Sequence, residues 1–163
     1  VEAMTMADRI VLMDDGRIRQ IGAPMALYRD PDDLMVAGFL GAPSMNMIAG
    51  QITDAVFAAG GVHLPADVGG YDGPATLGVR PEGLSLTPVP GGPELAARVS
   101  HVEQLGAETI LVAASEVSAF PPLRLRLSDG LARPVNGSAI TIHINPSAAL
   151  FFDAAGKRLR RTS

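Results

Sequence analysis

The sequence contains no cysteine and no tryptophan, and aromatic residues make up only 4% of its 163 positions. Without thiols, the chain forms no disulfide bond and offers no thiolate ligand to a metal ion. Hydrophobic residues nevertheless account for 47% of the sequence, so its core must be built from aliphatic side chains. Long apolar runs are lacking as well, because none approaches the ~20 residues that a membrane-spanning helix requires.

Positive charge is also in short supply. Lys and Arg number 13 against 17 Asp and Glu, and the formal net charge is -4. Proteins that bind nucleic acid usually carry a basic stripe. The only basic cluster here, Lys157, Arg158, Arg160 and Arg161, is predicted to be a solvated tail. We therefore expect no nucleic-acid partner.

Motifs for metal binding and nucleotide binding are missing too. His63, His101 and His143 lie far apart in the sequence, and we predict no metal site. His143 alternates with isoleucines and is expected on the polar side of its strand, as a surface or interface residue. The nearest approach to a phosphate-binding loop is Gly156-Lys157, which is followed by Arg158 where Ser or Thr is required, so no nucleotide site is predicted there.

Glycine and proline are abundant, with 18 and 13 copies, and this composition favours many turns between short elements. The chain starts without Met, inside what reads as a helix, so we expect a piece of a longer protein. A buried strand is predicted at 9–13, a tight turn at 14–16 and a second strand at 17–21. Two short helices follow at 24–28 and 33–40, with Asp32 as N-cap of the second and Gly41 just after its end.

The rest of the sequence indicates strands. One is expected from Met45 to Phe57 and a short return strand at 62–64. After the Pro90–Pro93 linker, Leu95, Ala97 and Val99 share one face, but the apolar positions then shift to Val102 and Leu105. That break predicts a β-bulge between residues 100 and 102. Clean alternation at 123–127 and 140–144 predicts half-buried antiparallel strands, with turns at 129–130 and 136–137.

Several short strands, one of them bent, are typical of small closed barrels. We predict a mainly β fold with a small α/β segment at the N-terminus and OB-like β-barrels, most simply a pair of them.

Two polar turns are the strongest candidates for contact with a partner. Arg80-Pro81-Glu82 holds two charges that either pair across the turn or reach outward. Glu103, Gly106 and Glu108 crowd a hairpin turn in which Gly106 is expected to take a special dihedral angle. His101 and Glu103 share a face of one strand if no bulge intervenes, which leaves a general acid–base pair open as an alternative.

A resemblance spans nearly the whole sequence. Residues 1–10, V-E-A-M-T-M-A-D-R-I, resemble the segment that follows the switch histidine in ATP-binding subunits of maltose-type and glycerol-phosphate-type ABC importers. The stretches G-V-R-P-E at 78–82 and V-E-Q-L-G-A-E-T at 102–109 resemble two signatures of the C-terminal domain of that family. Further matches occur in the family's order at Gly16–Ile18, Gln20–Gly22, Pro24, Leu27-Tyr28, Pro31, Val36–Gly41, Met45-Asn46, Leu150–Asp153, Gly156 and Arg158-Leu159.

The resemblance implies a division at residue 43. Residues 1–43 would be the end of a nucleotide-binding domain with linker helices, and 44–163 a transport-associated OB-like regulatory domain. It further implies a non-catalytic role in regulation and dimerisation, because the ATP-binding motifs of the family lie upstream of Val1. ATP and Mg would be cofactors of the full-length protein and not of this piece. Strands 9–21, cut from their sheet, are expected to pair with another copy or to rearrange.

The same resemblance implies partners and a location. The partners would be a second copy of the subunit, membrane permease subunits and in some members a regulatory protein, at the cytoplasmic side of the cell membrane. Interface residues would be Arg80, Glu82, Glu103, Gly106 and Glu108. The alternative left open is a binding module for a small oxyanion or sugar, for which Ser100, Thr109 and Ser115 offer hydroxyl groups.

Overall fold

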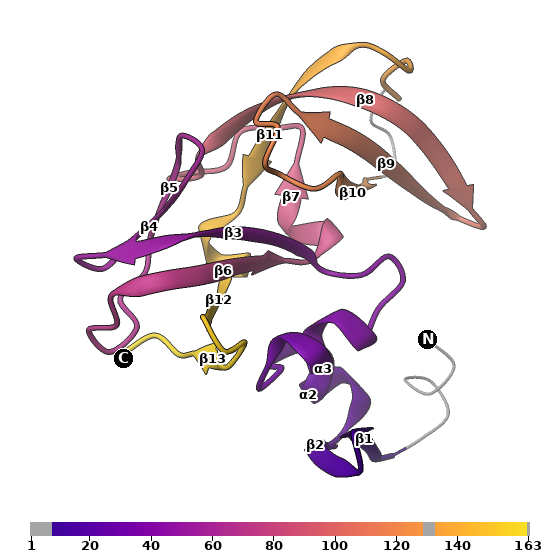
Figure 1. The fold of residues 1–163 in the computed structure, drawn as a ribbon. Helices are drawn as coiled ribbons and strands as arrows, with labels where there is room; N and C mark the ends of the chain where they lie inside the picture. The colour runs from indigo at the N-terminus through magenta and orange to yellow at the C-terminus, as the bar shows by residue number, and fades with distance from the viewer. Residues whose placement is uncertain (1–7, 129–132, 163) are drawn as a thin grey trace.

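The computed structural model describes residues 8–128 and 133–162, and strands are their main secondary structure (Figure 1). The two α-helices are α2 (Pro24–Arg29) and α3 (Leu34–Phe39), and the two 3-10 helices are η1 (Pro81–Gly83) and η2 (Pro146–Ala148). The strands are β1 (Ile10–Asp14), β2 (Arg17–Gly22), β3 (Asn46–Thr53), β4 (Val56–Ala59), β5 (Val62–Pro65), β6 (Gly73–Val79), β7 (Leu84–Ser85), β8 (Glu94–Leu105), β9 (Glu108–Ser115), β10 (Leu123–Leu127), β11 (Ala139–Ile144), β12 (Leu150–Asp153) and β13 (Arg158–Leu159).

The N-terminal hairpin forms as predicted, but it is not buried. Strands β1 and β2 pair antiparallel around a turn at Asp15 and Gly16, both with positive φ. Leu12 packs with α2 and α3, whereas Met13 is 60% exposed and Ile18 57% exposed. The hairpin therefore buries one face only. The two strands form backbone hydrogen bonds with each other along one edge. Their pairing with another copy stays a prediction. The expected helix at residues 1–7 lies outside the described residues.

The two helices lie close to their predicted positions, with one correction at the cap. Pro24 begins α2, where its missing N–H costs no hydrogen bond. The N-cap of α3 is Asp33 and not Asp32, because the Asp33 Oδ1 atom accepts a 2.9 Å hydrogen bond from the Val36 amide. Gly41 follows the helix with φ +98°, as expected for a residue just past a helix end.

Two antiparallel sheets form the body of the molecule. The six-stranded sheet has the order β13-β12-β6-β3-β4-β5 and the five-stranded sheet the order β10-β9-β8-β11-β7. Side chains from both sheets, among them Ile52, Leu77, Leu111 and Ile142, join one aliphatic core. The mainly β, barrel-like fold is confirmed, but the expected pair of barrels is wrong, since the two sheets close on a single shared core.

Two local predictions for the strands had different outcomes. The bulge is confirmed, because the register of β8 against β9 shifts between Val99 and His101. The single strand from Met45 to Phe57 is wrong: the chain turns at Asp54 and Ala55, both with positive φ, and β4 returns beside β3. A turn without glycine gave no local signal in the sequence. The turn at 136–137 is present, and the one predicted at 129–130 lies outside the described residues.

Asn46 joins the two sheets where no strand pairing does. Its side-chain Nδ2 donates to the Val79 carbonyl at 3.1 Å and to the Arg124 carbonyl at 2.9 Å. Its Oδ1 accepts from the Arg124 amide at 2.8 Å. Arg124 lies on β10, the edge strand of the five-stranded sheet. One buried amide therefore satisfies a free strand edge and nearly closes the barrel.

Candidate functional site

Arg80 is the polar centre of the contact between the helices and the barrel. It leaves the end of β6 and is 7% exposed. Its Nη1 donates to the carbonyls of Ala37 and Leu40 at 2.9 and 2.7 Å, and its Nη2 donates to the Tyr28 carbonyl at 2.9 Å. These carbonyls lie at the C-terminal ends of α2 and α3, where helix carbonyls lack partners and favour a cation.

Tyr28 connects Arg80 to the polar turn at residue 82. The Arg80 guanidinium carbon lies 4.0 Å from the centre of the Tyr28 ring, a cation–π geometry. The Tyr28 hydroxyl donates to Glu82 Oε1 at 2.7 Å. Burial, followed by the hydrogen bond to Glu82, raises the pKa of Tyr28 to about 12. Burial also lowers the pKa of Arg80, against the attraction of Glu82.

Gly41 makes room for this cluster. A Cβ atom at Gly41 would lie 2.9 Å from the Tyr28 ring and 3.4 Å from Arg80 Nη1, and its φ of +98° already disfavours other residues. The matching stretch that ends at this glycine and the one that contains Arg80 therefore belong to one structural site, although they are far apart in sequence.

The basic residues near the C-terminus make a second connection to the helical segment. Arg158 Nη1 lies 2.8 Å from Asp30 Oδ1 and also donates to the Pro31 carbonyl, and Arg160 contacts Asp30 and Asp32. Burial lowers the pKa of Arg158, and the hydrogen bond to Asp32 raises the pKa of Arg160. The prediction of a solvated tail is wrong for Arg158, whose side chain holds β13 against the segment before α3, whereas Lys157, Arg160 and Arg161 are exposed.

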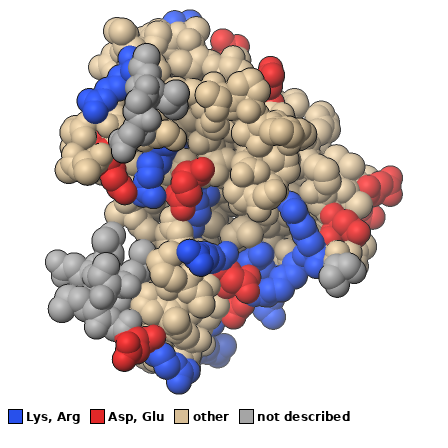
Figure 2. All heavy atoms as spheres, turned by 180° about the vertical axis from the view of Figure 1, so that it is seen from behind, with Lys and Arg blue, Asp and Glu red and all other residues tan. Residues whose placement is uncertain are grey.

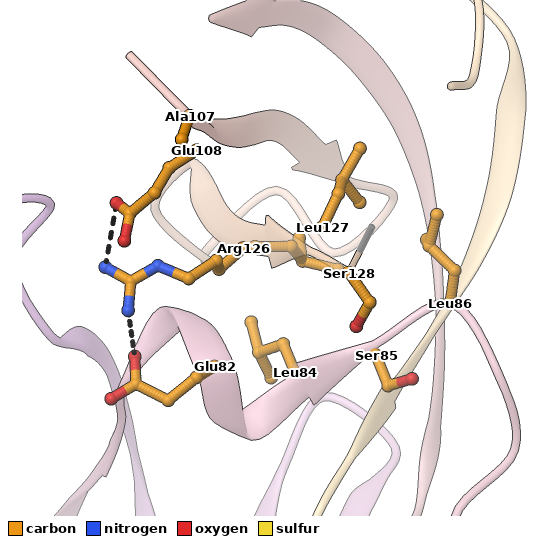
Figure 3. Close-up of a pocket in the computed structure, with 10 residues that line it drawn as sticks. Glu82, Leu84, Ser85, Leu86, Ala107, Glu108, Arg126, Leu127 and Ser128 are labelled. Carbon is orange, nitrogen blue, oxygen red and sulfur yellow. Dashed lines mark ion pairs between the residues drawn. The ribbon is translucent and has the colours of Figure 1, made fainter. Parts of the chain in front are cut away.

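Glu82 and Glu108 meet in a groove of about 450 Å³ on the barrel (Figure 3). Arg126 of β10 lies between them, 3.7 Å from a Glu82 oxygen and 3.5 Å from a Glu108 oxygen. Leucines and the hydroxyls of Ser85 and Ser128 line the rest of the groove. Two predicted site residues are thus brought together, and the sequence analysis missed Arg126, whose place in an alternating strand looked like that of any exposed residue.

Arg80, Glu103 and Gly106 do not share this groove. Arg80 is turned to the helices and does not pair across its turn with Glu82. Glu103 accepts a 2.8 Å hydrogen bond from His101, and both side chains are about half exposed. Gly106 has φ +64° in the β8–β9 turn. The His101–Glu103 pair that was left open as an alternative therefore exists, but it lies on an exposed surface and does not line the groove of Glu82 and Glu108.

The remaining predicted positions are scattered. His143 is 5% exposed, so its placement at the surface is wrong; β11 is covered on both faces at that point. Thr109 donates to the Gln104 side chain and Ser115 accepts from the Val117 amide, so two of the three hydroxyls considered for an oxyanion are engaged elsewhere, and Ser100 is exposed on β8. Gly156 lies in the β12–β13 turn rather than between a strand and a helix.

Three further properties of the described residues concern membrane-spanning helices, metal clusters and the distribution of charge. These residues contain no helix long and apolar enough to cross a membrane, and no cluster of three or more His, Asp or Glu side chains suited to a metal. Figure 2 shows acidic and basic side chains on the face seen from behind, with a group of basic side chains bordered by acidic ones in the lower half of the view.

Comparison with known proteins places these contacts in a family. The model of the TOBE domain matches residues 77–152, from β6 through β12, and so includes Arg80, Glu82, Arg126 and the β8–β9 hairpin. Residues 77–152 are a TOBE domain. The core of this TOBE domain extends beyond the matched range, since Ile48, Ile52 and Phe57 of β3 and β4 belong to it.

The relatives extend the similarity to nearly the whole chain. The sn-glycerol-3-phosphate import ATP-binding protein UgpC of Jannaschia sp. is 40% identical over 98% of this chain and 44% of its own length. The lactose transport ATP-binding protein LacK of Rhizobium radiobacter is 38% identical over 98% of this chain and 47% of its own length. The chain thus spans less than half of the length of these curated relatives. The resemblance seen in the sequence is confirmed.

The Tyr28 contact next to the TOBE domain leads to a prediction about alkaline stability. A tyrosine whose pKa is raised from 10.0 to about 12 on folding contributes stability that is complete below pH 10 and is lost as pH rises through 12. We expect Tyr28→Phe to flatten the pH dependence of the denaturation midpoint between those values. Urea denaturation followed by circular dichroism measures it. Tyr71→Phe, which removes a hydroxyl that donates to the Pro74 carbonyl and leaves the Tyr28–Glu82 contact in place, is the control for loss of a tyrosine hydroxyl.

Proposed function

We propose that this chain is the C-terminal, non-catalytic part of the ATP-binding subunit of an ABC importer, and that its TOBE domain serves regulation and dimerisation. The observation that carries the proposal is similarity over 98% of the chain to less than half of two importer ATP-binding proteins. The Arg80 and Arg158 contacts support it, because they fix the helices that lead in from upstream onto the TOBE domain.

The activity proposed for the full-length protein follows from its relatives. It would bind ATP with Mg and use hydrolysis to drive uptake of a sugar or similar solute through membrane permease subunits. It would then lie at the cytoplasmic side of the cell membrane, bound through those subunits. A regulatory protein would be a further partner, as the resemblance implies for some members of the family. ATP hydrolysis is not proposed for this chain alone.

The exposed apolar side chains of the N-terminal segment support the proposal that another domain packs against this segment in the full-length protein. Val11, Met13 and Ile18 of the β1–β2 hairpin and Phe39 of α3 lie at the surface. Leaving such side chains in water forgoes about 25 cal/mol for each Å² that burial would remove. We propose that the nucleotide-binding domain covers them, as expected for a remnant of its sheet.

Among the predicted interface residues, four remain available for contact. Glu82, Glu103, Gly106 and Glu108 are proposed as contacts because their side chains or backbone reach the surface. Arg80 is instead proposed as a positioning residue, since its donors are directed to carbonyls of its own chain.

Sedimentation equilibrium tests the proposed function. We expect this chain to form a dimer whose dissociation constant is the same with and without ATP and Mg, because the ATP site would lie outside it. A nucleotide-dependent shift would place an ATP site within these residues and contradict the proposal. A monomer at high protein concentration would contradict the dimerisation role.

A second candidate function is sugar binding in the groove of Figure 3. Its carboxylates, its guanidinium and the Ser85 and Ser128 hydroxyls are groups that hydrogen-bond to sugar hydroxyls. Two carboxylates against one guanidinium leave the groove acidic, which disfavours an oxyanion. We expect lactose to raise the melting temperature and molybdate to leave it unchanged. No shift with lactose or with other mono- and disaccharides would exclude this function.

A further inference from the structure

One strand edge of the TOBE domain is left without a partner. Strand β11 pairs with β8 from Glu94 to Arg98, and the Val99 backbone bonds to residues 137 and 138. From His101 to Leu105, β8 pairs with β9 on one side, and no strand in residues 8–128 and 133–162 pairs with it on the other. Figure 1 shows this end of the β8–β9 hairpin reaching beyond the rest of the molecule.

This edge carries little of the usual protection against pairing. Proteins guard free edges with proline, charged side chains such as lysine, bulges, short strands or covering segments. Here a bulge lies only at the near end, between Val99 and His101, and Glu103 is the one acidic residue. The five residues from His101 to Leu105 contain no proline and no lysine, and Leu105 is 48% exposed. The bulge between Val99 and His101 ends the pairing with β11, so the free edge starts where the sheet bends away.

The backbone of Val102 and Gln104 is directed toward the open side. Leu105 and Glu108 close the two-residue turn of the hairpin. In an antiparallel ladder, successive residues direct their N–H and C=O groups to opposite edges. Counting back from Leu105, the backbone N–H and C=O groups of the odd-numbered residues bond to β9. The backbone N–H and C=O groups of Val102 and Gln104 are therefore directed to the open edge, where a new strand can pair with them.

We propose that this edge pairs with the same edge of a second copy, antiparallel, with the two-fold axis at Val102. In this register His101 faces Glu103 of the second copy, and by symmetry Glu103 faces its His101. The two side chains already lie on one face of β8, 2.8 Å apart. The pairing therefore produces a four-membered cluster in which each imidazole has a carboxylate within the strand and another across it.

Other registers fit less well. An axis at Glu103 sets the two Glu103 carboxylates directly opposite each other, and like charges in that position destabilise a sheet. An axis at His101 opposes the two imidazoles and brings the bulge into the pairing. Self-complementarity around Val102 is what favours a second copy over an unrelated strand. The inference rests on the proposed dimerisation and names its surface.

A charge exchange tests the surface. His101→Glu is expected to weaken the dimer roughly tenfold or more, because symmetry gives two like-charge contacts in place of two favourable ones. Glu103→His should weaken it as well, and the double variant H101E/E103H should restore wild-type affinity, because each carboxylate again faces an imidazole. Sedimentation equilibrium gives the dissociation constants.

Glu94→His is the matched control, because it changes the same strand where β11 already occupies the edge. Circular dichroism and melting temperature confirm that each variant folds. If the wild type is a dimer and His101→Glu leaves its affinity unchanged, or if the double variant does not recover, this surface is wrong although the dimerisation role stands. If the wild type is a monomer, the dimerisation role fails, and this pairing fails with it.

Discussion

Replacing Arg80 with methionine is expected to lower the free energy of unfolding by about 3 kcal/mol and to loosen α2 and α3 from the barrel. Methionine keeps much of the aliphatic volume but removes three hydrogen bonds and the contact with the Tyr28 ring. The carbonyls of Ala37, Leu40 and Tyr28 then lose their partners in a largely buried place, which costs more than an ordinary hydrogen bond contributes. Urea denaturation measures the overall loss.

Hydrogen exchange gives the local part of this result. In Arg80→Met, the amides of α3 should exchange faster than in the wild type, while those of the central strands β3 and β6 should change only with global stability. Arg80→Lys is expected to fall between, since one ammonium cannot reach the carbonyls of both helices at once. Arg98→Met is the control, because Arg98 makes one exposed hydrogen bond to the Gly137 carbonyl. Unchanged exchange in α3 would show that Arg80 does not hold the helices.

Replacing Asn46 with alanine is expected to cost a similar amount, about 3 kcal/mol, through the barrel rather than the helices. The variant leaves both backbone groups of Arg124 and the carbonyl of Val79 without their amide partner. Because Asn46 is the link between β3 and the edge of β10, the change should also expose that edge. Denaturant midpoints and exchange of the β9 and β10 amides measure these two effects.

Asn46→Asp separates hydrogen bonding from size. The carboxylate can still accept from the Arg124 amide, but it cannot donate to the two carbonyls and places a buried negative charge beside them. We expect it to be less stable than Asn46→Ala at neutral pH. The control is Asn145→Ala, which removes an exposed cap of η2 and should cost about 1 kcal/mol or less. If Asn46→Ala and Asn145→Ala lose the same stability, the closure of the barrel does not depend on Asn46.

The two expected losses concern residues that local patterns treat as ordinary. Arg80 was predicted as an interface residue because its charge could reach outward from the turn and its stretch resembles a signature of the family. Its partners Ala37 and Leu40 lie 43 and 40 residues away in sequence. Asn46 was predicted only as a residue near the start of a strand, and its hydrogen-bond partner Arg124 is 78 residues away in sequence. Their roles depend on contacts that a sequence window does not contain.

The sequence by itself determined the local structure and the family of this chain. Alternation placed β8, β10 and β11, the break after Val99 predicted the bulge, and Gly16 and Gly41 indicated the ends of elements, because period and backbone dihedral preferences act over a few residues. Only the tertiary structure decided which charges meet. Arg80 turns inward, Arg158 holds the helices and Arg126 joins Glu82 to Glu108, since hydrogen-bond partners for buried donors are set by packing between distant segments.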